Sequence, residues 1–336
     1  MSKRSERKDE HIENYLKTSD YNDPLFGDIY LDHNSLSDVN FNDIDTSVEF
    51  LGRKISMPLM VNAMTGGGEL SADINEDLSS ICESLNIPMA VGSQTIALED
   101  NEALESFSLV KEKNLVRIGN LGAEKNLEDF KKAYEMIDAD GMQVHLNIAQ
   151  ELFMPEGDKD FRGYYDNIKN LVTSLDYPLI VKETGNGLSK KVCKKLIDAG
   201  VRYLDVSGCG GTNFIEIEDM RDFVSDYKEF YTWGVPTAKA IIDARSLSDE
   251  VFIIASGGIK TAVDLAKALI IGADMAAVSG EALRYLLLGS YEACYDYLKE
   301  MKERLQIIMA LLGASNIEEL KKVDYKLTGR LRDLVE

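Results

Sequence analysis

The segment VFIIASGGIKTAVDLAKALIIGADMAAVSG, residues 251–280, decides the fold because it places a helical pattern between two short apolar runs. The runs at 251–258 and 275–280 are short and apolar, as buried parallel strands are. Between them, the segment 260–274 carries Gly272 where a helix often ends. A strand, a helix and a second strand together predict a parallel βαβ unit.

Runs of the same kind recur throughout the chain, separated by helical patterns. They lie at 58–64, 88–93, 116–122, 141–147, 178–184 and 203–208. One of the helical patterns, SKKVCKKLIDAG, has Ser189 at the N-cap position and Gly200 just past the end. Eight such units predict an α/β fold, a closed (β/α)8 TIM barrel. The alternative, an open doubly wound sheet, needs no eighth unit, and no GxGxxG motif follows the first strand.

The length of 336 residues fits one barrel of roughly 250 residues with an extension at each end. We expect residues 1–57 to form an N-terminal extension that covers the active site, and residues 58–290 to form the barrel. Residues 291–336 are predicted as a C-terminal helical extension. A long insertion, residues 209–233, follows the sixth strand, and long loops at that end of a barrel usually serve the site.

Composition and charge exclude several classes of protein. A formal net charge of −21 at pH 7 argues against nucleic-acid binding, which needs a basic surface. We expect no membrane span, since no apolar run reaches about 18 residues. The charged N-terminus lacks the apolar core of a secretory signal, so we expect a cytoplasmic protein. The four cysteines form no CxxC pair, which disfavours a metal cluster.

The site of such a barrel lies at the carboxyl ends of the strands. Glycines follow the seventh and eighth strands: Gly257 and Gly258 after the seventh, and Gly280, next to Ser279, after the eighth. Loops at these two strands that lead into helices are the usual phosphate site of the fold. The alternative is that the glycines only permit tight turns. Two such turns at these two strands favour phosphate.

Lys182 closes the fifth strand, and a lysine in a barrel mouth needs an anionic partner. That partner is either a carboxylate, such as Glu183 or Asp205, or a reduced flavin ring, which is anionic at N1. Asn120 and Ser93 stand at the ends of neighbouring strands. Both side chains could form hydrogen bonds to the polar edge of a flavin.

The fourth strand, in GMQVHLNIAQE, has a polar face. Side chains alternate along a strand, so Gln143, His145 and Asn147 share one side and face the lumen. Gln150 and Glu151 follow in the loop and point at the ligand. A lone His145 would be a hydrogen-bonded core residue, but beside Asn147 we favour a functional role. Glu151 with phosphate oxygens and water could bind Mg²⁺.

Several motifs together resemble type 2 isopentenyl-diphosphate delta-isomerase, the FMN-dependent isomerase of isoprenoid synthesis. They are RKDEHI (7–12), NAMTGG (62–67), VGSQ (91–94), HLNIAQE (145–151), VKETGNG (181–187), DVSGCGGTNF (205–214), TWG (232–234) and ASGG (255–258). The resemblance extends from residue 4 to about residue 310. The pairing of RKxxHI with HxNxxQE is specific to that family, whereas SGG alone recurs in many flavin barrels.

The resemblance implies a set of site residues and cofactors. The implied substrate contacts, for a prenyl diphosphate, are Arg7, Lys8, Ser93, Gln94, His145, Asn147 and Gln150. The implied FMN contacts are Met64, Thr65, Gly66, Ser93, Asn120, Lys182, Ser207, Thr212, Gly257, Gly258, Ser279 and Gly280. Glu151 is the implied Mg²⁺ ligand and Gln150 the catalytic residue. NADPH is implied as the reductant of the flavin, with NADH left open.

The sequence departs from the family pattern at Thr95, where many members have arginine after GSQ. The diphosphate therefore has one cation fewer than in those members. The resemblance also implies a homo-oligomer, a tetramer or an octamer. The N-terminal tail would cover the site of its own subunit or that of a neighbour.

Isomerisation adds a proton at one carbon and removes one at another, but Gln150 cannot titrate. The hypothesis is that reduced FMN acts as acid and base while Gln150 orients or relays, and Lys182 stabilises the anionic flavin. The first alternative is an FMN-dependent hydroxy-acid oxidase or dehydrogenase. Such enzymes need histidine and arginine near the last loops, and the three histidines here all lie in the first half of the chain. The second alternative is a flavin-binding barrel without catalysis.

Overall fold

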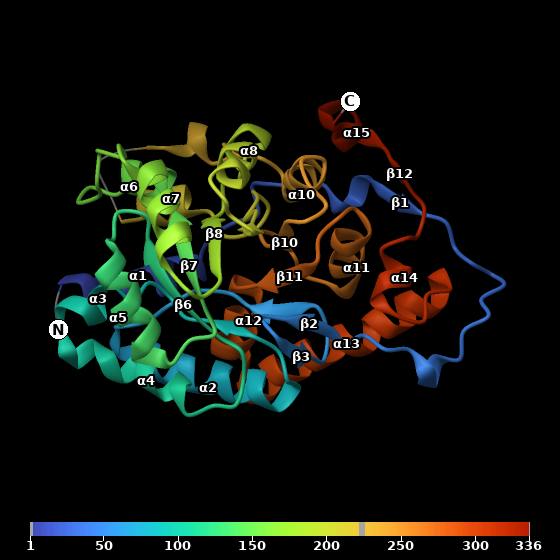
Figure 1. Ribbon diagram of the computed structural model, residues 1–336, viewed down its shortest axis with the longest axis horizontal. Coiled ribbons are helices and arrows are strands. Elements are labelled where there is room, and N and C mark those ends of the chain that lie inside the picture. The colour runs from blue at the N-terminus through green and yellow to red at the C-terminus, as the bar shows by residue number, and fades with distance from the viewer. Residues whose placement is uncertain (1–2, 222–225, 336) are drawn as a thin grey trace.

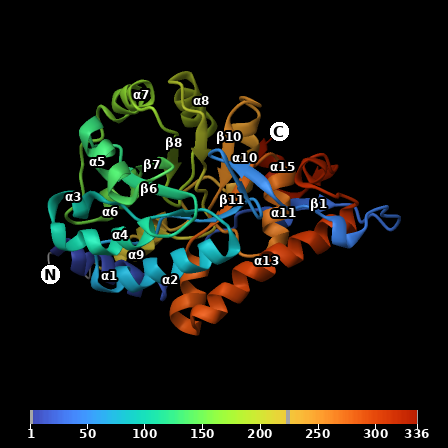
Figure 2. The same ribbon diagram turned by 60° about the horizontal axis from the view of Figure 1, so that its bottom comes forward.

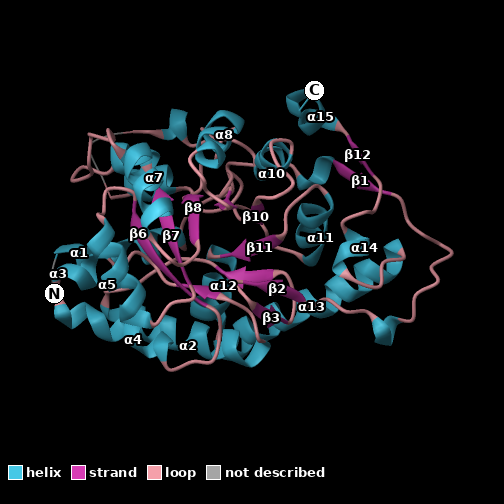
Figure 3. Cartoon of the chain, viewed as in Figure 1, coloured by secondary structure: helices cyan, strands magenta, loops and turns pink. Residues whose placement is uncertain are grey.

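The computed structural model describes residues 3–221 and 226–335, and its centre is a closed barrel of eight parallel strands (Figures 1 and 3). In order around the barrel these strands are β4 (Leu59–Val61), β5 (Met89–Ala90), β6 (Arg117–Gly122), β7 (Gly141–Leu146), β8 (Leu179–Glu183), β9 (Tyr203–Asp205), β10 (Phe252–Ala255) and β11 (Met275–Val278). Strand β11 pairs in parallel with β4 and closes the barrel. The predicted (β/α)8 fold is confirmed.

Helices follow the strands and form the outer layer of the barrel (Figure 1). They are α2 (Glu69–Leu85), α3 (Thr95–Glu99), η3 (Asn101–Leu104), α4 (Glu105–Lys111), α5 (Leu127–Ile137), α6 (Ile148–Phe153), α7 (Tyr164–Ser174), α8 (Lys190–Asp198), α9 (Phe214–Asp219), η4 (Lys228–Phe230), α10 (Thr237–Arg245), α11 (Ala262–Ile270), α12 (Gly280–Arg284), η5 (Tyr285–Gly289) and α13 (Tyr291–Leu312). Helix α11 shows how the sequence sets these boundaries. Thr261 and Asp264 form a capping box at its start, and Gly272 follows its end with a φ of +124°.

A hairpin from the N-terminal extension seals the amino-terminal end of the barrel. Strands β2 (Val48–Phe50) and β3 (Arg53–Ile55) pair antiparallel. Phe50 and Ile55 are buried among apolar side chains of the barrel strands, including Met60 and Ile180. This plug leaves only the opposite end of the barrel, where the strands finish, to hold a ligand.

The C-terminal segment joins both the barrel and the N-terminal extension. Helix α13 packs against α11 and α2, so it fills the place of the eighth barrel helix although it lies within the predicted extension 291–336. Beyond it lie α14 (Ile317–Leu320), β12 (Tyr325–Leu327) and α15 (Gly329–Val335). Strand β12 pairs antiparallel with β1 (Ile29–Leu31), which ties the C-terminal segment to the N-terminal extension (Figure 1).

Helix α1 (Lys3–Tyr15) lies beside α2 and α9, at the end of the barrel where the strands finish (Figure 2). Short 3-10 turns, η1 (Phe26–Asp28) and η2 (Phe41–Asp43), complete the N-terminal extension. The predicted insertion 209–233 contains α9 and η4, and its residues 222–225 lie outside the described residues. None of the described helices combines the length and the apolar character that a membrane span needs.

Candidate active site

A cavity of about 350 Å³ opens at the carboxyl ends of the barrel strands. Side chains and loops that follow the strands form its wall, and α1 and α9 cover part of its mouth. The predicted site residues that line it are Arg7, Lys8, Met64, Ser93, Asn120, His145, Asn147, Gln150, Glu151, Lys182, Ser207, Thr212, Gly257, Ser279 and Gly280. Residues from widely separated parts of the sequence thus meet in one cavity.

A second hollow of about 320 Å³ adjoins the first and contains the glycine loops of β10 and β11. Gly257 has a φ of +97°, and a Cβ atom there would collide with the backbone of Gly208. A Cβ atom at Gly280 would collide with the Tyr15 ring. Gly258 and the cations of Lys260 and Arg284 also line this hollow. The carboxylates of Asp20 and Glu281 line it too, and Asp20 accepts from Lys260 at 2.7 Å. Close backbone and the Arg284 cation suit an anionic group of the size of a phosphate.

Three predicted site residues lie outside both cavities. The Gln94 side chain is buried below β6, where it accepts from the Asn120 backbone N–H (2.9 Å) and donates to the Ala133 carbonyl (2.8 Å). The hydroxyl of Thr65 is likewise occupied by Ser71 at 2.6 Å. A Cβ atom at Gly66 would meet the Phe107 ring rather than a cavity. The prediction that Gln94 contacts substrate is therefore corrected, because its side chain points into the core.

Lys182 is buried, and its Nζ donates to the backbone carbonyl of Glu183 at 2.6 Å. The Glu183 carboxylate has different partners, since it accepts from the backbone N–H groups of the loop that follows, including Thr184 and Gly185 at 2.7 Å each. Burial lowers the pKa of Lys182, while the charges of Asp205 and Glu183 raise it. The loop thus fixes the Lys182 ammonium group at the cavity wall. Burial removes water from this charge, and the anionic edge of a bound ring could take the place of that water.

His145 lines the same cavity, and its Nδ1 atom lies 2.7 Å from the Asn120 side-chain oxygen. Burial, assisted by the charge of Lys182, lowers the pKa of His145 to about 3. The ring is therefore neutral at physiological pH when the cavity holds no anion.

Gln150 and Glu151 lie in the first turn of α6, three and four residues after the N-cap residue Asn147. The Glu151 carboxylate accepts from the Asn147 amide and from the Asp158 backbone N–H, both at 2.8 Å. No cluster of three metal-binding side chains occurs within residues 3–221 and 226–335. A divalent ion at Glu151 would therefore take its other oxygens from a ligand and from water, as Mg²⁺ commonly does.

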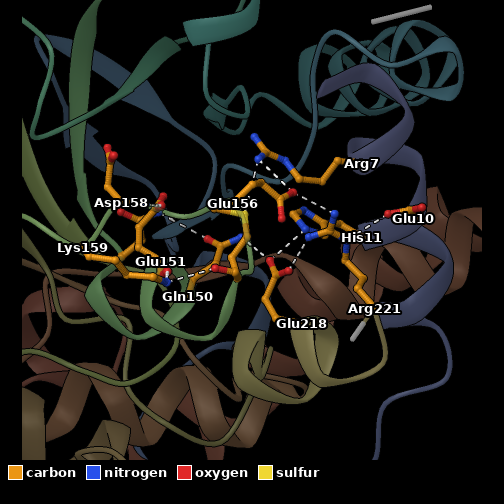
Figure 4. Close-up of polar contacts among 12 residues, drawn as sticks. Arg7, Glu10, His11, Gln150, Glu151, Glu156, Asp158, Lys159, Glu218 and Arg221 are labelled. Atoms are coloured by element: carbon orange, nitrogen blue, oxygen red, sulfur yellow. Dashed lines mark hydrogen bonds and ion pairs between the residues drawn. The ribbon is translucent and has the colours of Figure 1, made fainter. Parts of the chain in front are cut away.

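Glu218 on α9 is a site residue that the sequence did not identify (Figure 4). It is fully buried, and its Oε1 accepts from the Gln150 amide at 3.2 Å and lies 2.9 Å from His11 Nε2. Its Oε2 accepts from Arg221 at 2.6 Å. Burial acts to raise the pKa of Glu218, but the contacts with His11 and Arg221 outweigh it and lower that pKa. Only its place in the insertion 209–233 could have suggested a role.

Ion pairs hold α1 over the mouth of the cavity (Figure 4). Arg221 contacts Glu10 on α1 at 2.9 Å and Glu156 at 2.8 Å. Arg7, predicted to bind substrate, lies 3.4 Å from the same oxygen of Glu156. A bound anion could draw Arg7 away from this half-exposed carboxylate at little cost, because such surface pairs contribute about 0–1 kcal/mol.

Comparison with known proteins places this chain in a defined class. A model of the FMN-dependent dehydrogenase family matches residues 12–117 and 131–326. Solved structures agree in fold: a flavocytochrome b2 variant with bound pyruvate has a TM-score of 0.73 at 17% identity, covering 96% of this chain and 84% of that chain. Mandelate oxidase with benzoyl-formic acid has a TM-score of 0.67 at 13% identity, covering 94% of each. Fold and family model define a barrel of the FMN-dependent dehydrogenase class.

Curated relatives narrow the class. An isopentenyl-diphosphate delta-isomerase of Geobacillus sp. is 42% identical over 330 residues, which covers 97% of this chain and 94% of the relative. The enzyme of the same name from Moorella thermoacetica is 39% identical, covering 99% and 96%. That from Sulfurisphaera tokodaii is 36% identical, covering 98% and 93%. The chain belongs to the isopentenyl-diphosphate delta-isomerase family, as the sequence motifs indicated.

Proposed function

We propose that this protein interconverts isopentenyl diphosphate and dimethylallyl diphosphate, using reduced FMN and Mg²⁺. The observation that carries the proposal is one cavity that joins Gln150 and Glu151 to His145, Asn147 and Lys182. The names of the full-length relatives support the reaction.

The residues present fit FMN. The hollow with Gly257 and Gly280 suits the phosphate, and Lys182 suits the ring edge that becomes anionic on reduction. Reduced FMN, when bound, supplies the group that gives and takes a proton at the substrate carbons, which Gln150 cannot do. The buried ammonium of Lys182 stabilises negative charge in a place from which water is largely excluded.

Gln150 orients the reacting part of the substrate. Its amide nitrogen donates to the ionised Glu218, so its amide oxygen faces the other way, 3.5 Å from the Asn147 amide. Because the amide is neutral and its direction is fixed, Gln150 contacts the hydrocarbon part of the substrate without taking the proton that is transferred at the substrate carbons. Arg7, Lys8 and the Mg²⁺ ion at Glu151 bind the diphosphate and hold that chain in register.

Lys125 is a further cation for the diphosphate. It lines the same cavity as Thr95, where the family resemblance leaves one cation missing. Its Nζ lies 3.7 Å from Glu124 and 4.0 Å from Glu99, so these carboxylates hold it only loosely. A phosphate oxygen can therefore recruit it.

Replacing Lys125 by methionine should raise KM for isopentenyl diphosphate about 10-fold or more and leave kcat nearly unchanged. The change corresponds to losing one charge-assisted hydrogen bond of about 1.5 kcal/mol. Adding Thr95→Arg to Lys125→Met should recover much of the affinity. Lys131→Met, on the exposed face of α5, is the matched control. An unchanged KM in Lys125→Met would remove Lys125 from the binding site.

The function is tested by conversion of isopentenyl diphosphate with FMN, Mg²⁺ and NADPH or NADH, each omitted in turn. Product should form only when flavin, metal and reductant are all present. The reaction in deuterated water should place solvent deuterium in the product. Oxidation of a 2-hydroxy acid without isomerisation would favour the oxidase alternative, and a flavin-bound protein inactive on both would favour the non-catalytic barrel.

A further inference from the structure

A continuous chain of hydrogen bonds crosses the barrel lumen beneath the cavity. The Asn62 amide donates to Asp205 (2.7 Å), the Gln143 amide to Asn62 (2.8 Å), and the Asn120 amide to Gln143 (2.8 Å). His145 Nδ1 lies 2.7 Å from the Asn120 oxygen and ends the chain. Asp205 and Gln143 are fully buried, and Asn62 and Asn120 are nearly so. Members of four different barrel strands or strand ends are thus linked.

The chain has one possible direction. The Ala63 backbone N–H, which can only donate, contacts the Asn62 oxygen at 2.9 Å, so the nitrogen of the same amide donates to the Asp205 carboxylate. Both contacts fix which side of the Asn62 amide is oxygen. Gln143 must then donate to Asn62 and present its own oxygen to Asn120. Each amide that donates its N–H to one neighbour must present its oxygen to the next, so the direction is passed along the chain.

The direction determines the state of the imidazole ring. Asn120 donates to Gln143, so its oxygen is what faces His145. His145 can meet an oxygen only with a proton on Nδ1. In the neutral ring Nε2 then has no proton, and it is the nitrogen left for the cavity.

We infer that Asp205 is a positioning residue that, through Asn62, Gln143 and Asn120, holds His145 in its Nδ1–H form and leaves Nε2 as the ring atom that gains a proton when an anionic ligand binds. A bare Nε2 repels an anionic oxygen, whereas a protonated Nε2 donates to it. Entry of a diphosphate is therefore coupled to proton uptake at this ring. The consequence for diphosphate binding rests on the proposed function, but the state of the ring in the resting protein does not.

The second oxygen of Asp205 provides a natural control. It accepts from the Ser256 hydroxyl and from the Ser207 backbone N–H (3.2 Å), outside the chain. Ser256→Ala removes one of these donors and leaves the link to Asn62 intact. Gln143→Leu interrupts the chain and leaves both Asp205 and Lys182 in place. Asn62→Leu, by contrast, disconnects Gln143 from both groups that set the direction of the chain, Asp205 and the Ala63 backbone N–H.

The experiment is nitrogen NMR of the full chain, as purified, with ¹⁵N-labelled histidine. The sequence has three histidines, and His145→Gln identifies the signal of His145. The wild type and Ser256→Ala should show a protonated Nδ1 and a bare Nε2 at neutral pH. Gln143→Leu and Asn62→Leu should each move most of the ring population to the Nε2–H form.

Three results would overturn the inference. These are a wild-type ring in the Nε2–H form, an unchanged ring in Gln143→Leu, and an unchanged ring in Asn62→Leu. The wild-type spectrum decides even if a variant fails to fold. Because the ring is observed without turnover, a failed inference and a failed isomerase assay are separate outcomes. Proton uptake on adding inorganic pyrophosphate, measured in weakly buffered solution and lost in His145→Gln, tests the coupling itself.

Discussion

Glu151→Gln is expected to lower kcat/KM for isopentenyl diphosphate about 100-fold or more and to abolish the response to Mg²⁺. The Glu151 carboxylate lines the cavity beside Asn147, and a glutamine amide keeps its size but not its charge. A 100-fold loss corresponds to about 3 kcal/mol, within the range for removing one partner of a buried charged contact. Steady-state kinetics over a range of Mg²⁺ concentrations measure both effects.

Measuring the FMN bound to Glu151→Gln distinguishes a variant that has lost only its metal from one that has lost its folded structure. Glu151 lies away from the glycine loops of β10 and β11, so the visible spectrum of bound FMN should match that of the wild type. Glu128→Gln, which makes the same chemical change on the exposed face of α5, should leave every parameter unchanged. A Glu151→Gln protein that still responds to Mg²⁺ would place the metal elsewhere.

The barrel and the residues that line its cavity could be predicted because both depend on short stretches of sequence. These are the alternation of side chains along each strand and the polar or small residues at each strand end. The prediction that Gln143 faces the lumen is confirmed, because its amide contacts Asn62 and Asn120 on other strands. Gln94 was misplaced for a related reason. It follows a short strand, where the sequence does not say whether a side chain turns into the cavity or under the next strand, and β6 offers it a backbone N–H.

Contacts between distant segments were beyond the sequence. Glu218 meets Gln150 and His11 only because α9, α6 and α1 converge at the cavity mouth. Its buried charge is stabilised by Arg221, three residues further along the chain, and by Gln150 and His11 from two other elements. Local spacing encodes only the first of these contacts.

The role of α13 had a local signal. Its buried side chains include Cys294, Leu298, Met301 and Leu305, at helical spacing along one face. Such a stripe is typical of a helix that packs on a layer of the protein, but we interpreted residues 291–336 from the sequence as a terminal helical extension. The sequence did not show that α13 completes the unit begun by β11, because η5 and the N-cap residue Ser290 interrupt the helical segment between them.

Gln150→Asn should lower kcat about 100-fold while the affinities for FMN and Mg²⁺ stay near those of the wild type. The shorter side chain withdraws the amide by about 1.5 Å. The present 3.2 Å contact with Glu218 then exceeds hydrogen-bond length. The amide loses its fixed direction, and a misplacement of about 1 Å can cost about 100-fold in rate.

Single-turnover kinetics with reduced enzyme measure this effect free of product release. Gln306→Asn on α13 makes the same change far from the cavity and should turn over normally. Glu218→Gln leaves Gln150 at full length but weakens the hydrogen bond that directs its amide, so kcat of the Glu218→Gln variant should fall too. If Gln150→Asn turns over within about three-fold of the wild type, the amide serves only the packing of α6. The orientation of the substrate would then rest on the diphosphate contacts alone, with Arg7, Lys8 and the metal at Glu151 carrying the whole of it.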